Sequence, residues 1–283
     1  KSTEKIIRKC VHCGMCNATC PTYQILGDEL DGPRGRIYMI KDMLEQNKPA
    51  TEKIVKHIDR CLPCYSCLTT CPSGVDYMHL IDHGRNHVER TYKRPLFDRI
   101  MRELLAFILP KPKVFKLLGQ ISNLTKPVHF LLPKKMKHMV SFMPKTFSKS
   151  EFPENNVFKP KKKSISKVAL LTGCVQKVIS PNINDASINV LLRHGIEVHV
   201  LREIKCCGSL THHMGKEDIS HKFFVENINA WYDLYENQKL DAILVNTSGC
   251  GTTIKDYDFI FKDHPDKILR KKAKKISEIA LDI

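Results

Sequence analysis

The chain has 283 residues, 42% of them hydrophobic, which suits a globular protein of two domains with real apolar cores. No run approaches the roughly 18–20 apolar residues that cross a bilayer, and residues 1–20 lack the apolar stretch of a signal peptide, so a membrane-spanning or secreted chain is disfavoured. The net charge of +16 is concentrated between residues 93 and 167, where 18 Lys and Arg face 4 Asp and Glu. Because this segment lacks interleaved aromatic residues and any known nucleic-acid-binding module, we expect no nucleic acid partner.

A cysteine pattern occurs twice in the first 72 residues. Each copy reads Cys-x-x-Cys-x-x-Cys-x-x-x-Cys-Pro, over residues 10–21 and 61–72. This spacing is the ligand pattern of two [4Fe-4S] clusters, and in two-cluster ferredoxins the fourth cysteine of each copy binds the other cluster. We therefore assign one cluster to Cys10, Cys13, Cys16 and Cys71, and the second to Cys61, Cys64, Cys67 and Cys20.

Zinc and disulfides are the alternative interpretations of this pattern. Structural zinc sites usually separate their two Cys-x-x-Cys pairs by a longer stretch, whereas here four cysteines occupy eleven residues and a proline follows directly. Disulfide frameworks suit secreted chains. Both alternatives are therefore weaker than iron–sulfur ligation.

The sequence between the two copies, which are 51 residues apart, has helical periodicity. Pro33 and Thr51 mark helix starts. Two apolar stripes follow them: Ile37, Ile40, Met43 and Leu44, then Ile54, Val55 and Ile58. Small β-type ferredoxins join their motifs by a shorter, strand-rich stretch, so we expect an α-helical ferredoxin domain over residues 1–92.

Residues 93–166 are predicted to form a basic, proline-rich connector with helical pieces. Short apolar stretches lie at 96–109, 114–118 and 128–132. Within the first stretch, apolar residues recur at helical spacing: Leu96, Phe97, Ile100, Met101, Leu104, Leu105 and Ile108. Such a helix either packs on its own protein or, with its basic flanks, lies on a membrane surface.

From 167 to 283 short apolar runs alternate with helical stretches. Strands are expected at 168–171, 197–201 and 242–245, and helices at 184–194 and 217–238. Pro181 opens the first helix and Gly195 closes it. The β-α-β-α-β order predicts a Rossmann-like parallel sheet. The fold class is therefore mainly α plus α/β.

The remaining four cysteines each follow a predicted strand, so we expect them to meet at the carboxyl edge of the sheet, where ligands bind in open α/β folds. Neighbouring Cα atoms lie only about 3.8 Å apart, so the adjacent pair suits metal ligation better than a disulfide. Gly208, Gly249 and Gly251 are expected to turn the backbone there. The candidate ligands of a third iron–sulfur centre are Cys174, Cys206, Cys207 and Cys250.

The segments around these cysteines read Thr-Gly-Cys at 172–174, Cys-Cys-Gly at 206–208 and Thr-Ser-Gly-Cys-Gly at 247–251. They resemble the cysteine-rich CCG domain of heterodisulfide reductases, anaerobic glycerol-3-phosphate dehydrogenase and glycolate oxidase. In heterodisulfide reductases the last segment reads Cys-x-x-Cys, whereas here Thr253 occupies the place of the second cysteine.

Five further segments point to one family within this group: residues 10–14, 20–23, 28–38, 70–75 and 180–184. With them, nearly the whole chain resembles the iron–sulfur subunits of bacterial glycolate oxidases. That family continues into a second CCG repeat, and the chain has no initiating Met, so we expect a fragment with the first repeat only. The resemblance implies an electron-transfer subunit without a catalytic site of its own. Its expected partners are FAD-binding flavoprotein subunits that oxidise glycolate or D-lactate. The expected acceptor is a membrane quinone, at the cytoplasmic face of the cell membrane.

Three alternatives stay open. The chain can belong to a related complex of the anaerobic glycerol-3-phosphate dehydrogenase or heterodisulfide reductase type. It can be a thiol or disulfide reductase acting through Cys206 and Cys207, or a zinc-dependent structural or nucleic-acid-binding protein. The absence of a Gly-x-Gly-x-x-Gly after a strand and of a P-loop agrees with a flavin on a separate subunit.

Five further residues have both a functional and a plain structural interpretation. Arg34 and Arg36 can dock an acidic flavoprotein or raise the reduction potential of a cluster. Arginines before a helix more commonly lie in solvent. His12 is placed to bond a cluster sulfur or lies at the surface. His212 and His213 either assist at the CCG site or are structural.

Overall fold

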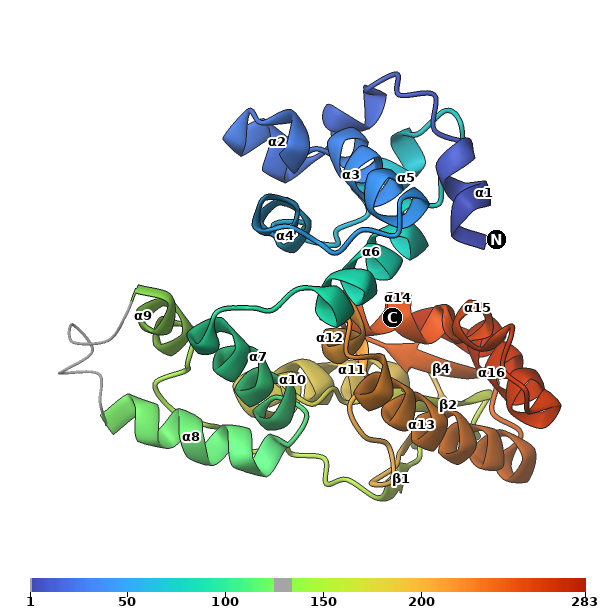
Figure 1. Cartoon of the computed structure of the whole chain (residues 1–283). Helices are drawn as coiled ribbons and strands as arrows, with labels where there is room; N and C mark the ends of the chain where they lie inside the picture. The colour runs from blue at the N-terminus through green and yellow to red at the C-terminus, as the bar shows by residue number, and fades with distance from the viewer. Residues whose placement is uncertain (1, 125–133) are drawn as a thin grey trace. The chain divides into compact units, whose positions relative to one another are not determined.

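A computed structural model describes residues 2–124 and 134–283 (Figure 1). The predicted apolar stretch 128–132 lies outside the described residues. The chain divides into two units, residues 1–99 with 210–219, and residues 100–209 with 220–283. Each unit has an apolar core of its own.

The first unit is built from helices around one core. Thr51 accepts a hydrogen bond from the Ile54 N–H and so caps α4, and Pro33 is the first residue of α3, which confirms both predicted helix starts. Ile40, Ile58 and Leu80 are fully buried where α3, α4 and α6 meet. The elements are α1 (Ser2–Arg8), η1 (Met15–Asn17), α2 (Pro21–Leu26), η2 (Glu29–Asp31), α3 (Pro33–Glu45), α4 (Glu52–Asp59), α5 (Ser66–Thr70) and α6 (Tyr77–Thr91), with most of α12 (Ser209–His213).

The second unit contains a five-stranded sheet in the order β1-β3-β2-β4-β5. The three predicted strands are confirmed as β2 (Ser166–Leu171), β3 (Ile196–Val200) and β4 (Ala242–Val245), and they pair in parallel. The expectation of a purely parallel sheet is wrong. β5 (Ala280–Asp282) adds a further parallel strand, but β1 (Asn156–Phe158) pairs antiparallel with β3 and makes the sheet mixed.

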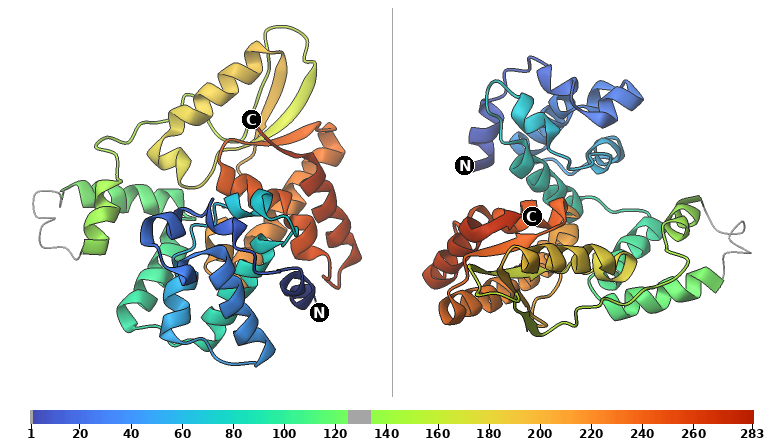
Figure 2. Two further views of the ribbon diagram at one scale, coloured as in Figure 1. Left: turned by 90° about the horizontal axis from the view of Figure 1, so that it is seen from above. Right: turned by 180° about the vertical axis from the view of Figure 1, so that it is seen from behind.

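Helices cover both faces of this sheet (Figure 2). Side chains alternate along β2, so Val168 and Leu170 pack against one helix layer while Ala169 and Leu171 pack against the other. The first layer is α11 (Pro181–Arg193), which begins at Pro181 and ends before Gly195 as predicted. The second is α13 (Glu217–Gln238), α14 (Ser248–Lys255), α15 (Tyr257–Phe261) and α16 (Lys267–Ile279). A short helix, α10 (Gln176–Ile179), precedes α11.

Residues 96–124 and 134–141 form three further helices: α7 (Leu96–Ile108), α8 (Pro112–Leu124) and α9 (Lys134–Ser141). The predicted apolar stripe of α7 divides between two environments. Met101, Leu105 and Ile108 line an apolar groove of about 230 Å³ shared with α8 and α9, whereas Leu96 and Ile100 are exposed. In the described part of the chain, no helix has the length and apolar character needed to cross a membrane.

Candidate iron–sulfur sites

The two cysteine loops of the first unit repeat the same backbone turns. The residue after the second cysteine is left-handed in both copies, Gly14 with φ 82° and Tyr65 with φ 55°. The fourth cysteines are equally alike, with φ −85° and ψ 113° at Cys20 and φ −78° and ψ 112° at Cys71. Each is followed by a proline, which favours this extended conformation. The sequence repeat is therefore also a structural repeat.

The two copies also contact each other through equivalent residues. Thr70 Oγ1 donates to Thr19 Oγ1 over 3.1 Å, and these threonines immediately precede the two fourth cysteines. Thr19 Oγ1 also donates to the Ser66 carbonyl of the second copy at 3.4 Å. Contact between equivalent positions is typical of a local two-fold relation, in which each fourth cysteine leaves its own loop beside the other one.

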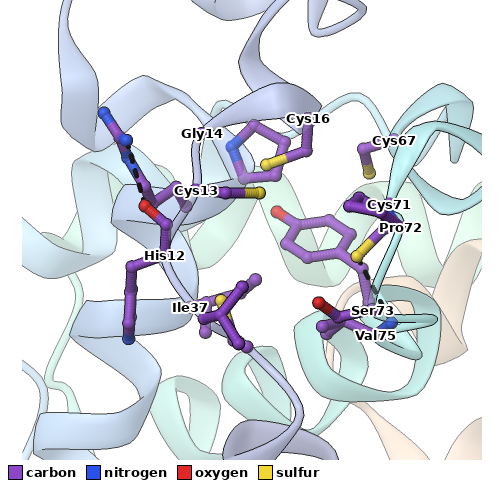
Figure 3. Close-up of a pocket in the computed structure, with 15 residues that line it drawn as sticks. His12, Cys13, Gly14, Cys16, Ile37, Cys67, Cys71, Pro72, Ser73 and Val75 are labelled. Atoms are coloured by element: carbon purple, nitrogen blue, oxygen red, sulfur yellow. Dashed lines mark hydrogen bonds between the residues drawn. The ribbon is translucent and has the colours of Figure 1, made fainter.

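A pocket borders the first cysteine set (Figure 3). Cys10, Cys13, Cys16 and Cys71 line it together with Cys67, and no Asp or Glu side chain does so. The thiols of Cys13, Cys16 and Cys71 lie around its interior in Figure 3. Soft thiolate donors without carboxylates suit iron–sulfur clusters.

The electrostatic partners of the thiols link each loop to the fourth cysteine of the other. Cys16 interacts with Cys10 and Cys71. Cys67 interacts with four thiols, those of Cys61, Cys16, Cys20 and Cys64. Cys71 thus lies near the first loop and Cys20 near the second, although Cys67 also lies close enough to Cys16 to connect the two sets. The ligand assignment itself stays a prediction.

Burial holds several of these thiols in their neutral form. It raises the pKa of Cys67 to about 12, with further contributions from the neighbouring thiols. Burial likewise raises the pKa of Cys16 and Cys61. Thiolates at these positions need a nearby positive charge, which iron ions supply on binding.

Arg36 is only 1% exposed, so the solvent interpretation of this residue is wrong. Its guanidinium lies among polar groups beside Cys20, including Asp31, Thr22 and the His57 carbonyl. Sequence reasoning missed this network, since only the unusual density of charged residues at 28–36 pointed to it.

Arg34, in contrast, is half-buried. Its Nε donates to Glu29 at 2.6 Å and its Nη1 to the His12 carbonyl at 3.2 Å. The His12 ring packs edge-on against Tyr38, with 6.3 Å between ring centroids. Both side chains therefore have structural contacts at the edge of the first cysteine loop.

In the second unit, the four predicted cysteines meet at the carboxyl edge of the sheet. Cys174 Sγ lies 3.3 Å from Cys206 Sγ, and Cys207 Sγ lies 2.9 Å from Cys250 Sγ. They follow β2, β3 and β4, as expected, with Cys250 in the first turn of α14. A cavity of about 430 Å³ opens beside Cys174 and Cys206. Five basic residues and one glutamate line it: Lys111, Lys113, Lys177, Arg202, Lys205 and Glu154.

Buried hydrogen bonds fix the adjacent cysteine pair. The Asn227 side chain accepts from the Lys205 N–H at 2.8 Å and donates to the Cys206 carbonyl at 2.9 Å. Tyr257 Oη donates to the Cys207 carbonyl at 3.2 Å. Asn227 and Tyr257 are fully buried, and their positions in helices gave no signal in the sequence.

Only one of the three glycines expected to turn this backbone does so. Gly208 has φ +81°, and a Cβ there would lie 2.4 Å from Phe224. Gly249 and Gly251 are instead ordinary residues of α14 without positive φ, so the expectation for them is wrong. Thr253, in the place of a second cysteine, is buried and donates its hydroxyl to the Gly249 carbonyl at 3.3 Å.

Three of these thiols, those of Cys174, Cys206 and Cys207, have raised pKa values. The hydrogen bond to Cys206 and burial raise the pKa of Cys174 far above its usual range. Donation from Cys174 lowers the pKa of Cys206, but the bond to Cys207 and burial outweigh it, and the resulting pKa is about 12. Cys174 and Cys206 therefore stay protonated until a metal replaces their protons.

His212 and His213 contact α6 of the first unit. His213 Nδ1 lies 2.9 Å from Asp82 Oδ1, and His212 Nε2 lies 3.5 Å from Asp82 Oδ2. Burial alone would raise the pKa of Asp82, but these two hydrogen bonds lower it well below its usual range. The structural interpretation of both histidines therefore accounts for their contacts.

Comparison with known proteins places both cysteine sites within described families. A 4Fe-4S dicluster domain matches residues 6–75, and a cysteine-rich domain matches residues 168–255. The glycolate oxidase iron–sulfur subunit of Escherichia coli (strain K12) is 43% identical over 99% of this chain and 65% of its own length. Over nearly its whole length, the chain is therefore similar to glycolate oxidase iron–sulfur subunits.

Two further relatives agree with this relationship at greater distance. The probable glycolate oxidase iron–sulfur subunit of Bacillus subtilis (strain 168) is 29% identical, covering 91% of this chain and 60% of its own length. One of the subunits of the fumarate reductase (CoM/CoB) of Methanothermobacter marburgensis is 24% identical, over 98% of this chain and 48% of its own. The chain thus spans less than two thirds of these relatives. No solved structure gave a significant match.

Proposed function

We propose that the chain is the iron–sulfur electron-transfer subunit of a complex that oxidises glycolate, or D-lactate, to the 2-oxo acid. The oxidation releases two electrons and two protons and takes place on a flavoprotein subunit. The single observation that carries this proposal is the 43% identity to the Escherichia coli subunit across both cysteine sites. The quinone of a membrane is the proposed final acceptor.

Eight cysteines of the first unit are the proposed ligands of two [4Fe-4S] clusters. Cys10, Cys13, Cys16 and Cys71 hold one, and Cys61, Cys64, Cys67 and Cys20 hold the other. The contact between Thr19 and Thr70 supports this crossed arrangement, as do the interactions of Cys16 with Cys71 and of Cys67 with Cys20. When bound, such clusters take up and release one electron at a time. Two of them can therefore accept, one by one, the two electrons of a reduced flavin.

Cys174, Cys206, Cys207 and Cys250 are the proposed ligands of a further iron–sulfur centre at the edge of a Rossmann-like sheet. Four thiols within contact distance and the buried support from Asn227 favour this role. Thr253 offers only a hydroxyl that is bonded to its own helix. Among the described residues, these four cysteines are therefore the proposed sulfur ligands of any centre at this edge.

The α7–α9 helices are the proposed contact with an anionic membrane surface at the cytoplasmic face. Leu96, Phe107 and Leu117 are more than half exposed on α7 and α8. Between residues 111 and 150 the sequence has nine lysines and no Asp or Glu. Exposed apolar side chains combined with a polybasic segment favour binding in the headgroup region of anionic lipid.

A Cys64→Ser variant tests the proposed electron-transfer path through the two clusters. One oxygen in place of a sulfur ligand should remove one cluster, lowering iron from about eight to about four per chain and stopping electron flow from glycolate through the flavoprotein. Full iron content with undiminished electron flow would refute the assignment. Iron loss without loss of electron flow would show that the second cluster lies off the path.

The alternative is an iron–sulfur subunit of a related complex, which the similarity to the Methanothermobacter marburgensis protein supports at 24% identity. The flavoprotein assay separates the two functions, because a subunit of another complex accepts no electrons when glycolate or D-lactate is the donor.

A further inference from the structure

The two proposed cluster sites have different electrostatic surroundings, although their loops repeat the same backbone. The difference begins at Arg36, which enters the core of the first unit from α3. Its Nη1 lies 3.9 Å from Cys20 Sγ, its Nη2 donates to Thr22 Oγ1 at 3.1 Å, and its Nε donates to the His57 carbonyl at 2.8 Å. A positive charge is thereby fixed beside a proposed ligand sulfur, away from solvent.

Two further donors approach the same cysteine set from α6, one of which, Tyr77, also lines the pocket of the first set. Tyr77 Oη donates to Cys61 Sγ over 3.6 Å, and Arg85 Nη2 donates to the Cys61 carbonyl over 2.7 Å. Tyr77 is 3% exposed and Arg85 is 8% exposed. Both contacts therefore lie in a region of low dielectric constant, where hydrogen bonds and charges act strongly.

Asp31 reduces this positive charge but does not cancel it. Its carboxylate lies 3.6 Å from Arg36 and is also bound by Arg60 at 2.7 Å and by His57 at 2.9 Å. Arg36 and Arg85 are thus the buried positive charges beside this cysteine set and Asp31 is the buried negative one, while Arg60 is 39% exposed. The aspartate holds Arg36 in place and shares its own charge with Arg60.

No equivalent buried cation contacts the first set within residues 2–124 and 134–283. There the Val75 N–H donates to Cys71 Sγ at 3.4 Å, the Arg34 backbone N–H donates to Cys16, and Cys16 Sγ lies 3.9 Å from Asn17 Oδ1. Arg34 borders the pocket of this set, but it is half-buried and bound to Glu29. Its charge is therefore screened by solvent and by an adjacent carboxylate.

We infer that Arg36, with Tyr77, gives the centre held by Cys61, Cys64, Cys67 and Cys20 the higher reduction potential of the two. Reduction adds one negative charge to a centre, and a nearby cation or a hydrogen bond to its sulfurs stabilises that charge. An electron shared by the two centres then resides mainly on this one. Arg36 is a positioning residue that determines which of the two centres has the higher reduction potential. The inference rests on the proposed two-cluster function.

Redox titration with EPR detection tests the inference on the anaerobically purified chain, with dithionite and mediators in place of glycolate and partner. Arg36→Met should lower the potential of one centre enough to change electron sharing at least tenfold, which is 59 mV for one electron. Tyr77→Phe, which removes only a hydroxyl, should lower the same potential by a smaller amount. Cys64→Ser identifies that centre as the signal that disappears.

Arg34→Met is the matched control, since it removes an arginine two residues away and should leave this potential unchanged. An unchanged potential in Arg36→Met, or a shift in the other centre, would overturn the inference. If Arg36→Met loses iron, Tyr77→Phe decides, and an unshifted potential there overturns it. Failure to find two iron–sulfur signals in the unaltered chain would instead contradict the proposed function.

Discussion

Gly208→Ala should weaken the second unit considerably more than an alanine at a comparable glycine. Gly208 has φ +81° directly after the adjacent cysteines, and a Cβ there would lie 2.4 Å from the ring of Phe224, which is fully buried. Gly195 is the matched control in the same unit. It has φ +79°, but its Cβ would lie 3.5 Å from Ile165, which is ordinary contact.

Both variants carry the left-handed backbone cost of about 1–2 kcal/mol. Only Gly208→Ala adds overpacking of the core, which costs about 1–3 kcal/mol. With a urea dependence of about 2 kcal/mol per M, the midpoint of Gly208→Ala should lie roughly 0.5–1.5 M below that of Gly195→Ala.

Fluorescence of Trp231 reports this transition, because it is the chain's one tryptophan and is fully buried in the same core as Phe224. In a Phe224→Leu background the overpacking penalty should vanish, so the total destabilisation by Gly208→Ala should fall to that of Gly195→Ala. Equal midpoints for the two alanine variants, or the same extra penalty without the Phe224 ring, would refute the steric explanation.

Three other predictions concern ionisation and the membrane. In the metal-free chain at pH 8, Cys67, with a pKa of about 12, should react with iodoacetamide far more slowly than exposed Cys64, and equal rates by mass spectrometry would contradict its burial. The lowered pKa of Asp82 means that its stabilisation is present above about pH 4 and is lost as pH falls below that value. The stability of Asp82→Asn, followed by circular dichroism, should therefore fall less steeply with decreasing pH than that of the unaltered chain. Parallel curves would argue against the contacts of Asp82 with His212 and His213. Ile121→Glu on α8 should reduce co-sedimentation with anionic vesicles several-fold, whereas Val190→Glu, an equally exposed position on α11, should not. Equal losses in both variants would exclude α8 as the contact.

Local signals in the sequence predicted much of the fold. The α13 helix begins and ends at the predicted residues, 217 and 238, and β4 covers the predicted 242–245. Thr51 caps α4 as expected because capping depends only on neighbouring residues. The four cysteines of the sheet meet because the carboxyl ends of parallel strands share an edge, which follows from the β-α-β order alone.

The features that the sequence did not predict depend on contacts between residues far apart in the chain. β1 is a strand because β3 offers it an edge 40 residues away, so no local pattern marks it. Arg36 is buried because Asp31, Thr22 and the His57 carbonyl together satisfy its guanidinium, and such an arrangement is invisible to periodicity. His213 meets Asp82 across 131 residues for the same reason.

Iron, acid-labile sulfide and EPR analysis of the anaerobically purified chain, with and without a glycolate-oxidising flavoprotein, tests the central claim most directly. The expected result is about eight irons from two [4Fe-4S] clusters, with further iron only if the four cysteines of the sheet also bind a centre, and reduction by glycolate only when the flavoprotein is present. Stoichiometric zinc without sulfide, or clusters that glycolate and flavoprotein leave oxidised, would contradict it.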